Sequence, residues 1–261
     1  MILYGGSSPN VKKVSIMLEE LEQPHEFRAV NCMRGENYTA EFAKLNPVRK
    51  IPVLVDPDGP EGKPCTVFES GAILIYLAEK SERFLPAAGA ARYAVLQWLM
   101  VQMSGIGPLF GQFTHFRRFA PPGNEYSLAR YETASRRMLE ALDDQLARNR
   151  YVAGDEYSIA DMAIYPWTRN RAKVWGGDWS AYANAWRWFA EVDARPAVAR
   201  MNEAYKAIEA REQAEGLKAS AEDIDRFMGR GRFSQSTVAA EAGDTSGNFY
   251  AQFQAKDARP K

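Results

Sequence analysis

Cysteine, histidine and net charge are all scarce in this chain of 261 residues. It holds two cysteines, Cys32 and Cys65, and two histidines, with no CxxC pair and no metal-ligand spacing. A disulfide framework and a metal site are therefore not expected. Lysine plus arginine and aspartate plus glutamate each number 33, so the formal net charge is zero. This balance argues against attachment to nucleic acid or to a membrane surface through bulk charge.

The chain also lacks long apolar runs. The opening residues, MILYGGSSPNVKK, hold no apolar core of a signal peptide, and no stretch is long enough to span a bilayer. We therefore expect a cytoplasmic protein, in a compartment where thiols stay reduced. Apolar residues make up 46% of the chain, which is enough to build a sizeable core in one or two domains.

Residues 1–86 predict a small α/β domain. Short apolar runs predict strands at 2–4, 26–30, 52–56 and 64–68, the last two flanking a turn rich in glycine and proline. Apolar residues three and four apart predict helices from residue 10, over 39–45 and over 71–79. The predicted order is β-α-β-α-β-β-α, and the first crossover should make a parallel pair of strands.

Residues 90–209 predict a second domain that is entirely helical. Helical spacing recurs over 91–103, 126–148, 159–174, 181–192 and 197–211, and residues 84–90 form a plausible linker. Residues 210–261 are more polar, and we expect an irregular C-terminal extension there. Its aromatic residues Phe233, Phe249, Tyr250 and Phe253 favour packing onto the body of the protein, with full disorder as the alternative.

Three motifs resemble those of the glutathione transferases. KIPVL at 50–54 resembles the segment around the family's cis-proline, FESGAI at 68–73 its Glu-Ser glutathione motif, and YSIAD at 157–161 the capping box of its core helix. The resemblance covers residues 1–209. It implies an α/β thioredoxin-like N-terminal domain followed by an all-α C-terminal domain, with glutathione as substrate and no metal.

Within that family, SPN at 8–10, GQFTHF at 111–116 and ARY at 129–131 resemble the bacterial nu class. That class is similar to the yeast nitrogen-regulator protein and includes glutathione-dependent disulfide reductases. Ser8 stands where the class usually has threonine, and Val11 where it has glycine. The resemblance implies a homodimeric enzyme that activates the glutathione thiolate, chiefly for disulfide reduction and more weakly for conjugation to electrophiles.

Glutathione is an anionic tripeptide, and the motifs offer partners for it. Ser70 begins a helix, where free N–H groups favour a carboxylate, although it could be only a capping residue. Glu69 could pair with the ligand's ammonium group. The backbone of Ile51, turned outward by a cis bond to Pro52, could pair with an extended peptide. Lys50 beside it could reach the glycyl carboxylate.

The reactive form of glutathione is its thiolate, which hydrogen-bond donors stabilise. Ser8 and Asn10 lie between the first strand and the first helix, and both side chains can donate. Ser7 is a rival in the same loop. Tyr4 is the better acid, but it lies in a predicted strand and should face the core or a neighbouring side chain.

Neither cysteine follows the first strand, so bound glutathione must supply the reacting sulfur. The resemblance also implies a polar glutathione contact for Asn37. Arg130 could reach a glutathione of the partner subunit, or it could be a solvated helix residue. The acceptor pocket is expected on a loop or helix end that carries Gln112, His115 and Phe116. His115 could be a general base or a packing residue.

The sequence is also compatible with other functions. The same thiolate could cleave aromatic β-ethers. A zeta-class cis–trans isomerase is disfavoured because Pro9 stands where that class has its cysteine. A transferase fold can also serve as a non-catalytic regulatory module. The five tryptophans between residues 167 and 188 are expected to be mostly core residues, although one or two could line a pocket.

Overall fold

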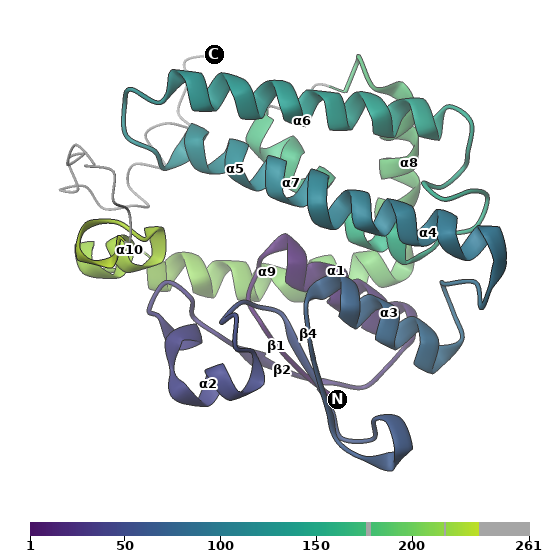
Figure 1. Ribbon diagram of the computed structural model, residues 1–261, viewed down its shortest axis with the longest axis horizontal. Helices are drawn as coiled ribbons and strands as arrows, with labels where there is room; N and C mark the ends of the chain where they lie inside the picture. Colours follow the sequence, from purple (N-terminus) through teal and green to yellow (C-terminus); the bar gives the residue numbers. More distant parts are fainter. Residues whose placement is uncertain (176–178, 217, 235–261) are drawn as a thin grey trace.

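A four-stranded mixed sheet forms the centre of the N-terminal domain (Figure 1). The structure, a computed structural model, describes residues 1–175, 179–216 and 218–234. The strands are β1 (Ile2–Gly5), β2 (Glu26–Ala29), β3 (Val53–Asp56) and β4 (Cys65–Phe68), in the order β2-β1-β3-β4. β1 pairs with β2 in parallel, and β3 is antiparallel to both of its neighbours. The predicted order of elements and the parallel first pair are confirmed.

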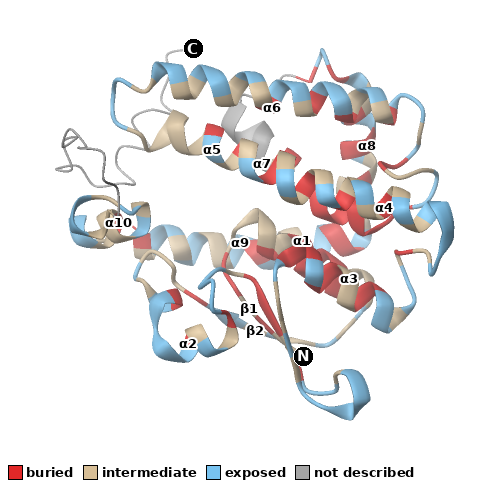
Figure 2. Cartoon of the chain, viewed as in Figure 1, coloured by how far each residue is buried: buried red, intermediate tan, exposed pale blue. Residues whose placement is uncertain are grey.

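Two helices of this domain pack between the sheet and the rest of the molecule. These are α1 (Pro9–Glu20) and α3 (Ser70–Ser81). Their apolar residues recur every three or four positions, so Val11, Val14, Leu18 and Ile73 are fully buried. The short α2 (Ala40–Leu45) lies on the other side of the sheet, after a 3-10 turn at Glu36–Tyr38. Figure 2 shows the buried residues gathered where α1 and α3 meet the helical domain.

The second domain is helical, as expected, and the predicted fold class is confirmed. Its main helices are α4 (Gly89–Val101), α5 (Gly107–Arg118), α6 (Glu125–Leu146), α7 (Ile159–Trp175), α8 (Ala183–Asp193) and α9 (Pro196–Gly216). α7 is the central one: its first seven residues, from Ile159 to Tyr165, have no exposed surface. The backbone N–H of Ile159 donates to the Phe84 carbonyl at 3.1 Å, which ties the linker to the core helix.

The capping box of α7 forms as predicted. The Asp161 carboxylate accepts hydrogen bonds from the backbone N–H and the hydroxyl of Ser158, at 3.0 and 3.1 Å. It also accepts from the Val152 N–H at 3.0 Å and from the Trp188 indole at 2.8 Å. One buried carboxylate thus joins the start of α7, the preceding turn and α8.

Two expectations about local structure need correction. Gln112 lies inside the full helix α5, into which a π-helical turn, η3 (Gln102–Ile106), leads from α4, whereas His115 and Phe116 lie in the last turn of α5, as a helix end requires. The chain is also not irregular from residue 210: α9 continues to Gly216, and α10 (Ala221–Met228) follows. The Ser220 hydroxyl and the Asp223 carboxylate form a reciprocal capping box that starts α10, which its polar composition had hidden.

One predicted anchor of the extension lies in the described part of the chain. Phe233 is half-buried, and the guanidinium groups of Arg226 and Arg232 lie over its ring at 4.9 and 5.0 Å. Phe249, Tyr250 and Phe253 lie outside the described residues. Within the ranges described, no helix has the length and apolar character needed to cross a membrane. No group of three or more His, Cys, Asp or Glu residues there could hold a metal ion.

Candidate active site

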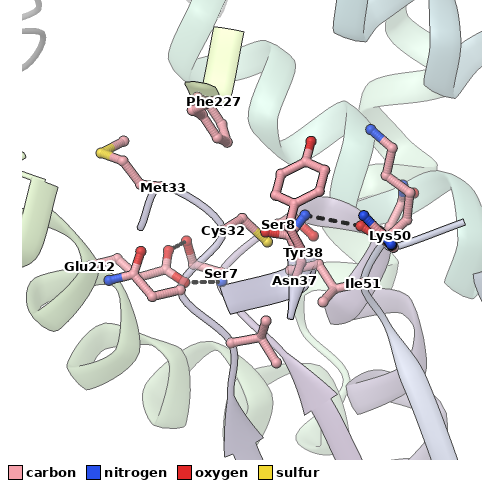
Figure 3. Close-up of a pocket in the computed structure, with 14 residues that line it drawn as sticks. Ser7, Ser8, Cys32, Met33, Asn37, Tyr38, Lys50, Ile51, Glu212 and Phe227 are labelled. Carbon is pink, nitrogen blue, oxygen red and sulfur yellow. Dashed lines mark hydrogen bonds between the residues drawn. The ribbon is translucent and has the colours of Figure 1, made fainter. Parts of the chain in front are cut away.

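A pocket of about 390 Å³ opens beside the loop between β1 and α1 (Figure 3). Three segments of the N-terminal domain form its floor: the β1–α1 loop, the residues after β2 and the residues before β3. The ends of α9 and α10 complete it. The lining residues are Ser7, Ser8, Asn10, Val30, Asn31, Cys32, Met33, Asn37, Tyr38, Arg49, Lys50, Ile51, Glu212 and Phe227.

The segment before β3 is shaped for a peptide ligand. The Ile51–Pro52 bond is cis, as predicted. The Asn46 side-chain amide donates to the Lys50 carbonyl at 2.8 Å, and the Asn37 amide donates to the Arg49 carbonyl at 3.0 Å. These two bonds hold the backbone on one side of Ile51, whose peptide groups are thereby presented at the pocket. An extended peptide could pair with them as an added strand.

Asn37 carries an unused acceptor at this pocket. Its side chain is 6% exposed and its amide nitrogen is bonded to the Arg49 carbonyl. Its Oδ1 atom is buried without a hydrogen-bond partner among the described residues. An unpaired buried acceptor costs about 1–3 kcal/mol. A ligand N–H group would satisfy it only if the Asn37 side chain turned toward the pocket, because Oδ1 has no exposed surface as it stands.

Ser8 is the capping residue of α1 and also lines the pocket. Its Oγ accepts from the Val11 N–H at 3.4 Å, and a hydroxyl keeps its own hydrogen when it accepts. That hydrogen can donate to an anion. The free N–H groups and the dipole of α1 add positive potential at the same place.

Asn10 is oriented by Trp167, one of the five tryptophans for which the sequence left both a core and a pocket position open. The Trp167 indole on α7 donates to Asn10 Oδ1 at 3.1 Å. Because an indole can only donate, its partner must be the oxygen of the amide, and the NH₂ group of Asn10 is left to face elsewhere. Asn10 therefore keeps two donor hydrogens at the pocket.

The two rivals of Ser8 have other partners. The Ser7 hydroxyl donates to Glu212 Oε2, and the Ser7 N–H donates to Glu212 Oε1 at 2.9 Å. The hydroxyl hydrogen of Ser7 is thus committed. Tyr4 does not line the pocket: its phenol oxygen accepts from Arg28 at 2.8 Å on the sheet.

Glu69 and Ser70 lie at the N-terminus of α3, outside the lining of this pocket. The Ser70 hydroxyl is buried and accepts from Lys13 Nζ at 3.2 Å. Lys13 also donates to Gln102 Oε1 in the π-helical turn, at 2.5 Å. Burial lowers the pKa of Lys13 to about 7, a shift that the Glu69 carboxylate partly opposes. The Ser70 hydroxyl donates to Met103 Sδ at 3.7 Å, and the free N–H groups at the start of α3 also favour a ligand carboxylate. The role of Ser70 in binding glutathione stays a prediction.

The residues expected to form the acceptor wall lie on α5 and do not line this pocket. Gln112 is exposed, and Phe116 stacks on Tyr131 with ring centroids 5.3 Å apart. His115 packs edge-on against Phe116, and burial followed by the charge of Arg230 lowers its pKa. These side chains stay candidates for a larger acceptor site.

Arg130 is exposed on α6 and lines a separate hollow. Its role across a dimer interface stays a prediction.

Several lining residues escaped sequence reasoning, and three of them, Cys32, Glu212 and Phe227, bear on the chemistry of the pocket. Cys32 does not follow the first strand, yet the fold brings it to the pocket from the end of β2. Burial, and then the charge of Glu212, raises the pKa of its thiol to about 11. No local motif marks any of the three, because each reaches the pocket through tertiary packing.

A thioredoxin-like sheet with a cis-proline, set against a helical domain, defines a class of thiol-handling proteins, and comparisons identify the family. The family model described as "Glutathione S-transferase, N-terminal domain" matches residues 7–80. The family model described as "Glutathione S-transferase, C-terminal domain" matches residues 125–191. The chain belongs to the glutathione S-transferase family.

Its relatives agree with the nu-class resemblance. The disulfide-bond oxidoreductase YghU of Escherichia coli is 42% identical over 213 residues, covering 76% of this chain and 72% of YghU. A glutathione transferase from Burkholderia graminis was solved with two glutathione molecules per subunit. It is 44% identical with a TM-score of 0.71, and the match covers 77% of this chain and 86% of the Burkholderia chain. A glutathione transferase from Pseudomonas putida was solved with one glutathione disulfide per subunit. It is 42% identical with a TM-score of 0.73, and the match covers 77% of this chain and 89% of the Pseudomonas chain.

Proposed function

We propose that this protein binds glutathione in the pocket beside the β1–α1 loop and uses its thiolate to reduce small disulfides. The glycyl carboxylate lies toward Lys50, the cysteinyl backbone pairs with Ile51, and the γ-glutamyl group reaches Glu69 and the N-terminus of α3. The sulfur lies toward Ser8. Asn37 turns toward the pocket and contributes its unpaired acceptor to the same peptide.

One observation carries this proposal: donors of Ser8 and Asn10 stand at the positive end of α1, in the same pocket as the cis-proline segment. Donors to sulfur favour the thiolate over the thiol. The names of the relatives support the reaction type, since one is a disulfide-bond oxidoreductase and others hold glutathione or its disulfide.

The reaction needs two glutathione molecules for each disulfide. The first thiolate attacks one sulfur of the substrate, the S–S bond breaks, and the leaving thiolate takes up a proton. A second thiolate attacks the mixed disulfide at the glutathione sulfur and yields glutathione disulfide, while the remaining half of the substrate leaves as a thiolate and takes up a proton. The substrate gains two electrons, which come from the two glutathione thiols. Conjugation to electrophiles would be a weaker activity of the same thiolate.

The test is turnover of bis(2-hydroxyethyl) disulfide with glutathione, followed through glutathione reductase and NADPH consumption. A rate well above the uncatalysed exchange supports the proposal. Glutathione binding without turnover would favour the non-catalytic regulatory module. We also propose a homodimer, measured by light scattering. The two free thiols, Cys32 and Cys65, suit the reducing cytoplasm as its location.

Glu69→Ala is expected to raise the KM for glutathione about tenfold with a smaller effect on kcat. The carboxylate would bind the ligand's ammonium group, an interaction present in both ground and transition states. Steady-state kinetics with varied glutathione measures the split. A large loss of kcat at unchanged KM would contradict this assignment. Glu79→Ala, at the exposed end of the same helix, is the matched control.

Replacing both cysteines with serine is expected to leave disulfide turnover within about twofold. Cys32 lines the pocket, but a thiol with a pKa of about 11 holds little thiolate at neutral pH. The kinetic assay is the same, and mass spectrometry of the wild type after turnover checks for a mixed disulfide. Loss of turnover in a folded double variant would show that a protein thiol takes part.

A further inference from the structure

Glu212 places a fixed carboxylate in the wall of the glutathione pocket. It comes from the last turns of α9, 205 residues away in sequence from Ser7, with which it forms both of its hydrogen bonds. The Ser7 N–H donates to Oε1 at 2.9 Å, and the Ser7 hydroxyl donates to Oε2. A carboxylate accepts at about four lone-pair positions, so each oxygen keeps capacity for another donor.

Among the residues that the structure describes, Glu212 forms no ion pair. Two cations that reach the same stretch of α9 are paired with other carboxylates. Lys12 pairs with Glu209 at 2.5 Å, and Arg34 pairs with Glu215 at 3.4 Å. Lys50 lies on the opposite side of the pocket in Figure 3. The pocket therefore has one basic side and one acidic side.

The surroundings of Glu212 strengthen its field. Met33 lies above Glu212 in the view of Figure 3, Cys32 lies on the side of Glu212 that faces Lys50, and Phe227 projects above them from α10. Charges interact more strongly beside such low-polarity groups than in open water. The raised pKa of the Cys32 thiol is a sign of this field, because Glu212 contributes to it after burial.

We propose that Glu212 makes the pocket selective for disulfides that carry an ammonium or guanidinium group near the S–S bond. This inference rests on the proposed disulfide reduction. Glutathione binds on the basic side of the pocket, where Lys50 lies. The disulfide substrate therefore binds on the acidic side, beside Glu212 and against the apolar ring of Phe227. A cation on the acceptor binds Glu212, and its S–S bond is thereby held at the glutathione sulfur. A carboxylate at the same position is repelled.

The experiment compares three small disulfides of similar length in the full chain at saturating glutathione. Cystamine carries two ammonium groups, bis(2-hydroxyethyl) disulfide is neutral, and 3,3′-dithiodipropionate carries two carboxylates. After subtraction of each uncatalysed rate, kcat/KM should fall in that order, with about tenfold between the cationic and anionic substrates. The ratio should shrink as salt is added, because ions screen the interaction.

Glu212→Gln is the decisive variant, since glutamine keeps an acceptor for Ser7 and removes the charge. The cystamine-to-dithiodipropionate ratio should fall to about one, and the neutral disulfide serves as the reference for any general change in activity. Glu215→Gln, one turn further along α9, is the matched control. Glu215 pairs with Arg34 and does not line the glutathione pocket, so its removal should leave the ratio unchanged.

Each other outcome has a distinct meaning. An unchanged ratio in Glu212→Gln, with the neutral disulfide still turned over, would overturn this inference and leave the proposed function standing. An equal loss of activity on all three disulfides in a folded Glu212→Gln protein would assign Glu212 a structural role and also overturn it. No turnover of any disulfide by the wild type would overturn the proposed function, and this inference with it.

Discussion

Ser8→Ala is expected to lower kcat/KM for disulfide reduction about 100-fold. The hydroxyl of Ser8 lines the pocket and keeps a free hydrogen after accepting from the Val11 N–H. Loss of one donor to a reacting anion typically costs about 2–3 kcal/mol, and 1.4 kcal/mol corresponds to a factor of ten. The thiol pKa of bound glutathione, followed by thiolate absorbance, should rise at the same time.

Ser8 also caps α1, so its replacement has a second effect that must be separated from the first. Loss of an N-cap costs about 1 kcal/mol of stability. Ser8→Thr is the matched control, because threonine keeps both the hydroxyl and the cap. We expect near wild-type activity and stability from it. If Ser8→Ala keeps its activity within a few fold, the role passes to Asn10, whose free amide group stands in the same pocket.

The fold could be predicted from sequence because its signals are local. Strands and helices of the N-terminal domain follow from apolar spacing, and the start of α7 follows from a serine and an aspartate three positions apart. The same capping signal stands at Ser220 and Asp223 and could have revealed α10. The polar, alanine-rich composition after residue 210 favoured an irregular segment over a helix and hid this capping signal. In the structure, Ile224 is buried and anchors α10.

α5 was missed for a different physical reason. Glycine and proline at 107 and 108 are typical of a break between elements. In the structure, Pro108 lies in the first turn of α5, where its missing N–H costs little, and the π-helical turn before it carries the chain on from α4. A proline near a helix start and one in a loop look the same in sequence.

The site was only partly predictable because its most informative contacts join distant segments. Trp167 orients Asn10 across 157 positions, and Glu212 binds Ser7 across 205. Lys13 lies fully buried between Ser70 and Gln102, although a lysine in an amphipathic helix is usually solvated. Such contacts depend on how the two domains pack, and no spacing within one helix encodes them.

Asp161→Ala is expected to lower the free energy of unfolding by about 3–5 kcal/mol, the usual cost of removing one partner from a buried charged network. Asp161 has no exposed surface and accepts four hydrogen bonds. Alanine would leave the donors of Val152, Ser158 and Trp188 buried and unpaired. Burial raises the pKa of Asp161 to about 6, against the opposing effect of those donors.

The second capping box of the chain provides the control. Asp223 accepts from the N–H and hydroxyl of Ser220 in the same arrangement, but at the partly exposed start of α10. Water can replace its bonds there, so Asp223→Ala should cost only about 1 kcal/mol. Urea unfolding at pH 7, followed by tryptophan fluorescence and by circular dichroism, measures both variants. Equal losses would mean that Asp161 acts only as a helix cap. A much larger loss for Asp161→Ala would show that its bonds to Val152 and Trp188 hold α7, α8 and the turn between α6 and α7 together.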